Sequence, residues 1–296
     1  MGPYIDLRCD FGFKYCLSDE IIMKSFLNAI LEGDEDTITS VKFENVEKPA
    51  SLKTKRGVTF DLLCTTDKGD SILIEMQNSC QKFFKTLANF YIYKLMDSKI
   101  SKGQKWIKME EDISKVIGIF IMGETMAGID KVVTRTGECD LDTGDLFWDR
   151  HRKYFVSLPK FSLDVNNITT RDIWFDFFKN LGRMENIDPS VYERADEGLL
   201  RLIEKAKIGA LSEKEHRIYE ASLKALEDEV DMEEAGYERG LEDGRKEGIE
   251  EGRKEGIEEG RKNNSIQIAK EMKKEGMNPS LIAKLTKRSL NEIETL

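Results

Sequence analysis

Cysteine and histidine are scarce in this chain of 296 residues, which has five cysteines and two histidines. No two cysteines have the CxxC spacing, so we expect neither a disulfide framework nor a zinc site. A metal would instead be held by carboxylate and carbonyl oxygens, which hard ions such as Mg²⁺ and Mn²⁺ prefer. Cys64 lies in an apolar run and is expected to be a small core residue rather than a nucleophile.

Long apolar runs are also missing. No stretch approaches the ~18 apolar residues of a membrane span, and the opening MGPYIDLRCDFGFK has no basic region followed by an apolar one, as a secretion signal would. The composition, 40% hydrophobic and 34% charged, is that of a globular protein with a polar surface. We expect a cytoplasmic protein that does not contact a membrane.

Positive charge is in deficit, because the formal net charge is -10. Lys and Arg drive phosphate binding, so the total argues against a nucleic-acid partner. Residues 227–234, EDEVDMEE, alone contribute six acids and no base. The remainder is mildly acidic and leaves room for a local basic surface.

Hydrophobic spacing predicts the order helix, three strands, helix, strand in the first part of the chain. Residues 18–31 and 79–97 have apolar residues at helical spacing, and Ser18 and Gly33 are the expected N-cap and stop of the first helix. Strand patterns cover four runs: 40–47, 58–65, 71–77 and the continuously apolar 115–122.

The second half is predicted to be mainly helical. We expect an outlying strand over 153–161, a helix with an aromatic face over 172–181 and amphipathic helices over 188–226. The aromatic face could stack on bases, but no basic residues interleave it, so buried packing is expected for its four large rings: Trp174, Phe175, Phe177 and Phe178.

Residues 236–262 form a repeat in which glycine occupies every fourth position. Seven glycines cost a helix ~7 kcal/mol relative to alanine, whereas each Glu–Lys pair four residues apart returns only ~0.2–0.5 kcal/mol. An isolated helix would be marginal, so the repeat is interpreted as a linker or a solvated helix. Packing of the glycine stripe against a second helix, which would make a homo-oligomer, is the alternative.

Three short helices are expected to close the chain. The first ends at Gly276, Asn278 and Pro279 cap the second, and Ser289 with Glu292 forms a capping box for the third. They could act as a helix-turn-helix reader of DNA, dock a partner or simply pack on the tail.

The hairpin over 58–77 is the informative part of the sequence. Asp67-Lys68-Gly69 suits a three-residue loop with Gly69 in the left-handed region. That loop places Asp61 opposite Glu75 and Thr59 opposite Gln77, so all three polar side chains at 61, 75 and 77 project from one face. The opposite face is expected to be core: Phe60, Leu62, Cys64, Ile72, Ile74 and Met76. A two-residue turn would shift this register and separate the carboxylates.

Two carboxylates directly opposite each other repel unless something compensates them. A divalent cation held by Asp61 and Glu75, with a backbone carbonyl beside Gln77 as a third ligand, would do so. Such an ion could polarise a phosphodiester and lower the pKa of water. The alternative is that both acids are ordinary solvent-facing residues of an amphipathic hairpin.

The spacing of Asp61 from Glu75-Met76-Gln77, in a hairpin followed by an aromatic helix, resembles the PD-(D/E)XK nuclease family transposases, also described as recombination-promoting nucleases. The resemblance extends over about residues 4–160, and the C-terminal repeat is also typical of that family. Further matching motifs are Asp10-Phe11 with Phe13-Lys14, Phe26-Leu27-Asn28-Ala29, and Gln81 with Phe84.

The resemblance implies an α/β fold with a restriction-endonuclease-like αβββαβ core and a helical C-terminal extension. It also implies a Mg²⁺- or Mn²⁺-dependent DNA endonuclease that acts in recombination or transposition. Asp61 and Glu75 would be metal ligands and catalytic together with Gln77, and Asp10 and Lys14 would be accessory. Gln77 stands where the wider superfamily has lysine, and an amide can orient a water but cannot take its proton.

We therefore divide the chain into four segments: a nuclease-like core at 1–165, a helical extension at 166–235, the repeat at 236–262 and a small helical segment at 263–296. Two departures from the family pattern are Lys55-Arg56-Gly57, where many relatives have acid-Arg-Lys, and Thr86-Leu87, where they have acid-Arg. The lost arginine could contact phosphate or brace a carboxylate. A catalytically decayed DNA-binding or protein-interaction module is thus the alternative to an active nuclease.

Overall fold

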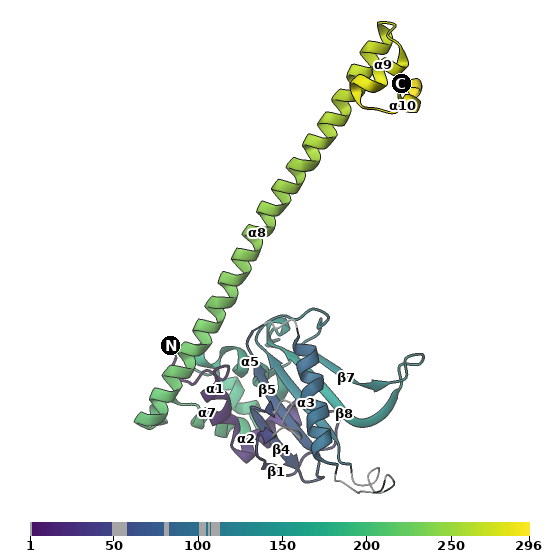
Figure 1. The fold of residues 1–296 in the computed structure, drawn as a ribbon. Coiled ribbons are helices and arrows are strands. Elements are labelled where there is room, and N and C mark those ends of the chain that lie inside the picture. The colour runs from purple at the N-terminus through teal and green to yellow at the C-terminus, as the bar shows by residue number, and fades with distance from the viewer. Residues whose placement is uncertain (1, 49–57, 80–82, 101–104, 106, 108–112) are drawn as a thin grey trace. The chain divides into compact units, whose positions relative to one another are not determined.

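The computed structural model describes residues 2–48, 58–79, 83–100, 105, 107 and 113–296. They form a mixed α/β fold (Figure 1) in two compact units, Met1–Asp231 and Met232–Leu296. Among these residues, no helix has both the length and the apolar character needed to cross a bilayer. The motif residues Lys55, Arg56, Gly57 and Gln81 lie outside the described residues.

A six-stranded sheet organises the first unit, in the order β1-β4-β5-β6-β8-β7. β4 is antiparallel to β1 and β5, β6 is parallel to β5 and β8, and β7 is antiparallel to β8. The strands are β1 (Val41–Phe43), β4 (Leu62–Thr66), β5 (Ser71–Gln77), β6 (Val116–Met122), β7 (Val133–Cys139) and β8 (Leu146–Ser157). β2 (Glu47–Lys48) and β3 (Val58–Thr59) pair separately.

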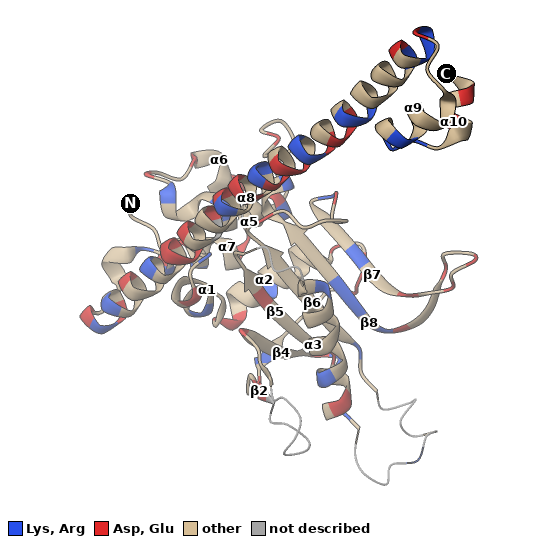
Figure 2. Cartoon of the chain, turned by 45° about the horizontal axis from the view of Figure 1, so that its top comes forward, with Lys and Arg blue, Asp and Glu red and all other residues tan. Residues whose placement is uncertain are grey.

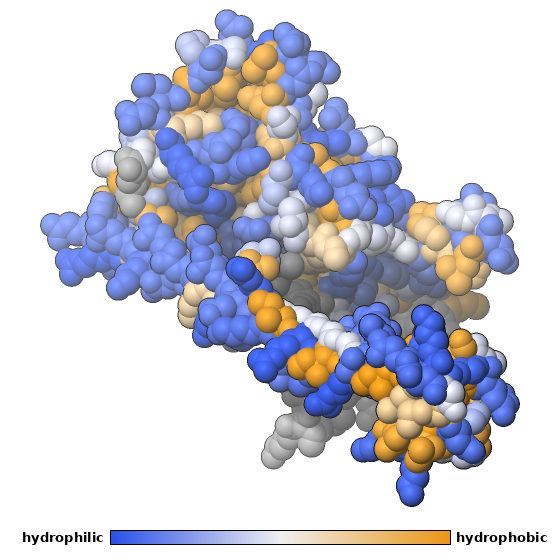
Figure 3. Space-filling view, turned by 90° about the horizontal axis from the view of Figure 1, so that it is seen from above, coloured by the Kyte–Doolittle hydropathy of each residue, from blue (hydrophilic) through white to orange (hydrophobic). Residues whose placement is uncertain are grey.

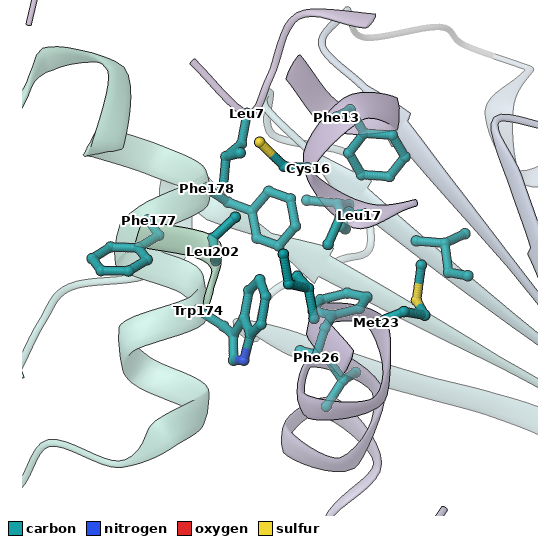
Figure 4. Close-up of a cluster of buried hydrophobic side chains, with 14 of the residues drawn as sticks. Leu7, Phe13, Cys16, Leu17, Met23, Phe26, Trp174, Phe177, Phe178 and Leu202 are labelled. Carbon is teal, nitrogen blue, oxygen red and sulfur yellow. The ribbon is translucent and has the colours of Figure 1, made fainter. Parts of the chain in front are cut away.

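One face of the sheet packs against the larger of two apolar cores, to which α1 (Asp10–Leu17), α2 (Glu20–Leu31), α5 (Thr170–Asn180) and α7 (Glu197–Lys205) contribute. Phe26 lies edge-on to Trp174 and Phe178, with ring centroids 5.3 and 5.5 Å apart (Figure 4). The four rings of the aromatic face are all buried. The prediction of packing rather than base stacking is confirmed, and Cys64 is likewise buried.

The other face of the sheet packs against α3 (Phe84–Ser98), whose Phe84, Ala88, Ile92 and Leu95 are buried. Leu63 and Leu73 belong to this second core, whereas their strand neighbours Leu62 and Ile72 belong to the first. The central strands are therefore apolar on both sides, as expected of strands covered by helices on both faces.

The predicted helix over 18–31 is confirmed as α2, but its N-cap is Asp19 rather than Ser18. The Asp19 carboxylate accepts hydrogen bonds from the N–H groups of Ile21 and Ile22, at 3.0 and 3.3 Å. The negative charge of a carboxylate at the N-terminus of a helix also interacts favourably with the helix dipole. Gly33 follows the helix with φ of 81°, which makes it the expected stop.

The strand predicted over 153–161 is confirmed over 153–157, where it is the end of β8, but its outlying position is wrong and Leu158–Lys160 form a 3-10 turn. β8 begins at Leu146 and lies between β6 and β7, so it is an interior strand. The first part of β8 is exposed or half-buried and mixes apolar with charged residues, and β7 has no apolar alternation, so neither segment stood out in the sequence. The helical region 188–226 is divided into α6 (Pro189–Arg194), α7 and the start of α8 (Glu213–Lys274).

α8 continues as one helix of 62 residues through the glycine repeat and beyond it. Two of the expected ion pairs form, Glu242 with Lys246 at 2.7 Å and Glu250 with Lys254 at 2.9 Å. Acidic and basic residues alternate along the helix (Figure 2). The repeat is therefore a helix rather than an irregular linker.

The second unit ends in a small helical cluster, in which the last turns of α8 meet α9 (Pro279–Thr286) and α10 (Leu290–Thr295). The predicted Asn278 cap with Pro279 at the first position and the Ser289–Glu292 capping box are both confirmed. The first of the three expected short helices, however, is the end of α8. The buried core of this cluster consists of Ala269, Ile282 and Ile293.

Candidate active site

The hairpin of β4 and β5 has the predicted register. Leu62 pairs with Ile74 and Thr65 pairs with Ser71. The Thr66 N–H donates to the Asp70 carbonyl at 2.9 Å, and Gly69 adopts φ of 84°. The three-residue loop that ends on a left-handed glycine is therefore confirmed.

Asp61 and Glu75 face each other across this hairpin, just before β4 begins. Oε1 of Glu75 accepts a hydrogen bond from the Asp61 N–H at 3.0 Å. In return, Oδ2 of Asp61 accepts one from the Met76 N–H at 3.1 Å. Each carboxylate is thus anchored by the backbone of the opposite chain segment, which holds the two acids together.

The prediction fails beyond Asp61. Thr59 pairs with Glu47 of β2, not with Gln77, and the Phe60 N–H donates to the Val46 carbonyl at 3.1 Å. Phe60 joins the core under α3 instead of the core that contains Leu62. The chain leaves β5 at this bend to pair with β2, so the period-two rule does not extend through it.

Gln77 lies at the end of β5, with its side chain turned to a local partner. Its Nε2 donates to the carbonyl and to the Oγ of Ser79, both at 3.0 Å. The Gln77 carbonyl accepts the Gly123 N–H at 2.8 Å. The structure therefore brings Asp61 and Glu75 together, while the donor groups of Gln77 are engaged elsewhere.

Burial and like charge dominate the electrostatics of the pair. Burial raises the pKa of Glu75 to about 8, and the charge of Asp61 adds to the rise. Burial also raises the pKa of Asp61, although the Met76 N–H and Lys14 oppose this. On α3, burial and the charges of Glu75 and Asp61 raise the pKa of Tyr91 to about 12. The site thus favours one proton or one added cation over two free charges.

The two predicted accessory residues also reach this place. Lys14 of α1 forms an ion pair with Asp10 one turn earlier, and its Nζ lies 3.4 Å from Oδ1 of Asp61. Burial lowers the pKa of Lys14, but the Asp10 and Asp61 carboxylates outweigh this effect and raise it. The sequence motif pointed to both residues but did not indicate which residues they contact.

Asp61 also lines a depression of about 190 Å³ between α1, the end of β5 and the start of α8. The Phe11 N–H donates to Oγ of Ser222 at 2.9 Å, which ties α8 to α1 beside it. The depression is lined on its polar side by Arg8, Asp10, Asp61, Asn78, Ser222 and Glu229. Nothing in the sequence indicated that α8 lies here.

Another family motif residue has a structural role. Asn28 of α2 donates to the Ile38 carbonyl at 3.0 Å and accepts the Ile38 N–H at 2.8 Å. This clamp fixes the chain just before β1. Thr86 and Leu87, which replace the acid-Arg pair of relatives, lie in the first turn of α3, where Leu87 packs on the second core.

A divalent ion at this site would be held by Asp61 and Glu75. Within the parts of the chain that the structure describes, no three Asp, Glu, His or Cys side chains cluster as metal ligands. Mg²⁺ is commonly held by only one or two carboxylates, with water and substrate phosphate completing its shell. Asp61 and Glu75, two hard oxygen donors with a mutual charge to neutralise, fit that requirement.

Comparisons with known proteins give one finding. No curated protein and no solved structure matches the chain. A family model described as PD-(D/E)XK nuclease family transposase matches residues 7–235, which is well over half of the chain. PD-(D/E)XK nucleases generally use divalent metals, and the family supports a nuclease or transposase role with DNA as substrate. The chain therefore belongs to the PD-(D/E)XK nuclease family transposases.

Proposed function

We propose that this protein is a DNA endonuclease that depends on Mg²⁺ or Mn²⁺ and acts in recombination or transposition. The observation that carries the proposal is the reciprocal anchoring of Asp61 and Glu75, which keeps two half-buried carboxylates together. Like charges in that position destabilise the fold unless a cation joins them. A metal site accounts for this arrangement.

The residues of the chain would divide the work as follows. Oδ2 of Asp61 and Oε1 of Glu75 are held by backbone N–H groups, so each carboxylate keeps a second oxygen for a ligand. A bound divalent ion would polarise the phosphodiester and make water more acidic. Gln77 Oε1 can accept a hydrogen bond from water, but it cannot take the proton.

The element order supports the finer parts of the proposal. α2, β1, β4, β5, α3 and β6 occur in the order of an αβββαβ core, with the short strands β2 and β3 inserted between β1 and β4. We assign this core to residues 1–165, the helical extension to 166–235, the repeat to 236–262 and the terminal helices to 263–296. A DNA substrate is consistent with a cytoplasmic protein.

A catalytically decayed DNA-binding or protein-interaction module is the second candidate, and one contact favours it. The Lys14 ammonium lies 3.4 Å from Asp61, where it already supplies part of the charge that a metal would bring. In that case the fold would survive without a metal.

Nicking of supercoiled plasmid in Mg²⁺ distinguishes the two candidates. We expect the wild-type protein to nick, and the Glu75→Ala variant and a chelator to abolish nicking. Asp142→Asn, an exposed acid of the β7–β8 loop, is the matched control and should nick normally. Nicking that persists in Glu75→Ala would show a contaminant or another site. DNA binding without nicking by the wild type would favour the decayed module.

A further inference from the structure

We propose that Lys14 is the resident cation of this site: it neutralises Asp61 when no metal is present and contacts a phosphate oxygen of the DNA when a metal is bound. This inference rests on the proposed function. It assigns Lys14 the task of a phosphate-binding residue that competes with the metal for one of its ligands.

The charge balance of the site singles out Lys14. Its charge acts on both Asp61 and Glu75. Arg8, which lines the depression, is committed to Asp6 through two hydrogen bonds of 3.1 and 2.7 Å. Among the residues that the structure describes, Lys14 is therefore the cation that lies beside the paired carboxylates.

The backbone of Lys14 is fixed, whereas its side chain is partly exposed. On α1, the neighbouring Phe13, Cys16 and Leu17 are buried, so the helix backbone is held by the core. The Lys14 side chain is 41% exposed, and that of its partner Asp10 is 68% exposed. Exposed ion pairs hold their members only weakly. The ammonium can thus exchange between Asp10, Asp61 and an arriving phosphate.

Gln77 does not supply a positive charge for the phosphate, whereas Lys14 can. The Gln77 amide is uncharged, and its donor group is bonded to Ser79. A phosphodiester gains negative charge as it reacts, and a positive group aimed at that charge stabilises it. Lysine is a compact point charge on a flexible stem, well suited to a phosphate oxygen. Once Asp61 has a metal to hold, Lys14 is released for that contact.

Metal binding by the full chain tests the inference without any need for activity. Mn²⁺ is titrated into the wild type, Lys14→Met and Lys14→Arg, with melting curves to verify folding. We expect Lys14→Met to bind Mn²⁺ about 3- to 10-fold more tightly, as expected for the loss of one nearby, partly screened positive charge. Lys24→Met, the same change on α2, is the control and should leave the Mn²⁺ affinity unchanged.

Nicking kinetics give the second measurement. We expect Lys14→Met to lower kcat by roughly 10²-fold with little change in KM, and Lys14→Arg to retain part of the rate. Weaker or unchanged Mn²⁺ binding by Lys14→Met would overturn the inference and leave Lys14 a structural brace. If Asp61→Asn bound Mn²⁺ as tightly as the wild type does, the metal site itself would be overturned. The two failures are therefore distinguishable.

Discussion

At the scale of single residues, the protein keeps an arrangement that folding alone would not favour. Glu75 is a half-buried acid beside a second acid, and burial together with Asp61 raises its pKa to about 8. An unfolded glutamate has a pKa of ~4.3. The folded, metal-free protein therefore binds a proton that the unfolded chain releases between these pH values.

This difference predicts how stability depends on pH. Because the pKa of Glu75 is higher in the folded state, proton binding by Glu75 stabilises the folded protein. This contribution to the free energy of unfolding is complete below pH ~4.3 and is lost as pH rises through about 8. We expect the free energy of unfolding in EDTA, measured in urea, to fall over this range. Glu75→Gln should lack that component, so the stability of the wild type relative to the variant should fall as pH rises. A difference between them that is independent of pH would contradict the prediction.

The acidic pair itself could be predicted from the sequence, because hairpin register depends on a local loop. The contact of Lys14 with Asp61 could not, because it joins a helix near the N-terminus to the start of β4. Helical spacing indicates which face Lys14 occupies, but not what that face meets. The ring cluster was intermediate: burial of Trp174 was predictable, whereas its edge-on contact with Phe26 was not.

At the scale of elements, the β4–β5 hairpin depends on one glycine. Gly69 adopts φ of 84°. A Cβ added at this position would have Ser114 as its nearest neighbour, 4.0 Å away. Backbone conformation, not space, therefore requires glycine here. The loop that it closes sets the register that brings Asp61 to Glu75.

Gly69→Ala should accordingly destabilise the protein by about 1 kcal/mol, the cost of a left-handed conformation for a residue with a Cβ. Urea unfolding measures this. Gly209→Ala is the matched control, because an added Cβ there meets nothing within 4 Å and its φ is not positive. If both variants lost the same stability, the loop would not depend on the glycine backbone.

The start of α8 is an element whose position the sequence did not indicate. Glu229 lines the depression beside Asp61, and Glu227 lines the adjoining one of about 360 Å³. These acids belong to the EDEVDMEE run. Their charge opposes an approaching phosphate, so this stretch is expected to weaken DNA binding.

Neutralising them should strengthen binding. We expect the double variant Glu227→Gln, Glu229→Gln to bind a short DNA duplex several-fold more tightly in low salt without divalent ions, as measured by fluorescence anisotropy. Asp142→Asn with Asp145→Asn changes the net charge equally but touches neither depression. If this control gained as much affinity, net charge alone would explain the effect.

At the scale of the whole molecule, the second unit carries apolar side chains that nothing in that unit covers. Ile249 is 63% exposed and Ile257 is 46% exposed, and Arg245, Arg253 and Arg261 lie at alternating places of the same every-fourth series. Apolar side chains reach the surface between polar ones in the view of Figure 3. A second copy of α8 would cover the two isoleucines and pair these arginines with glutamates of the repeat.

We therefore expect the full chain to associate with a second copy, and the double variant Ile249→Glu, Ile257→Glu to shift it to the monomer in light scattering. Val165→Glu changes another apolar residue that is 69% exposed, but in the first unit, and should have no effect. A wild-type protein that is monomeric at high concentration would rule out this self-association.

The sequence by itself determined the features that depend on near neighbours: α2 with its stop at Gly33, the β4–β5 register, β5 with its two acids, and the caps of α9 and α10. Such features follow from spacing, turn residues and capping side chains within a few positions of one another. The bend at Phe60, the interior place of β8 and the contact of Lys14 with Asp61 were decided only in the tertiary structure. Each of these depends on which distant segment competes successfully for a hydrogen bond, a sheet edge or a charge, and local patterns do not encode that outcome.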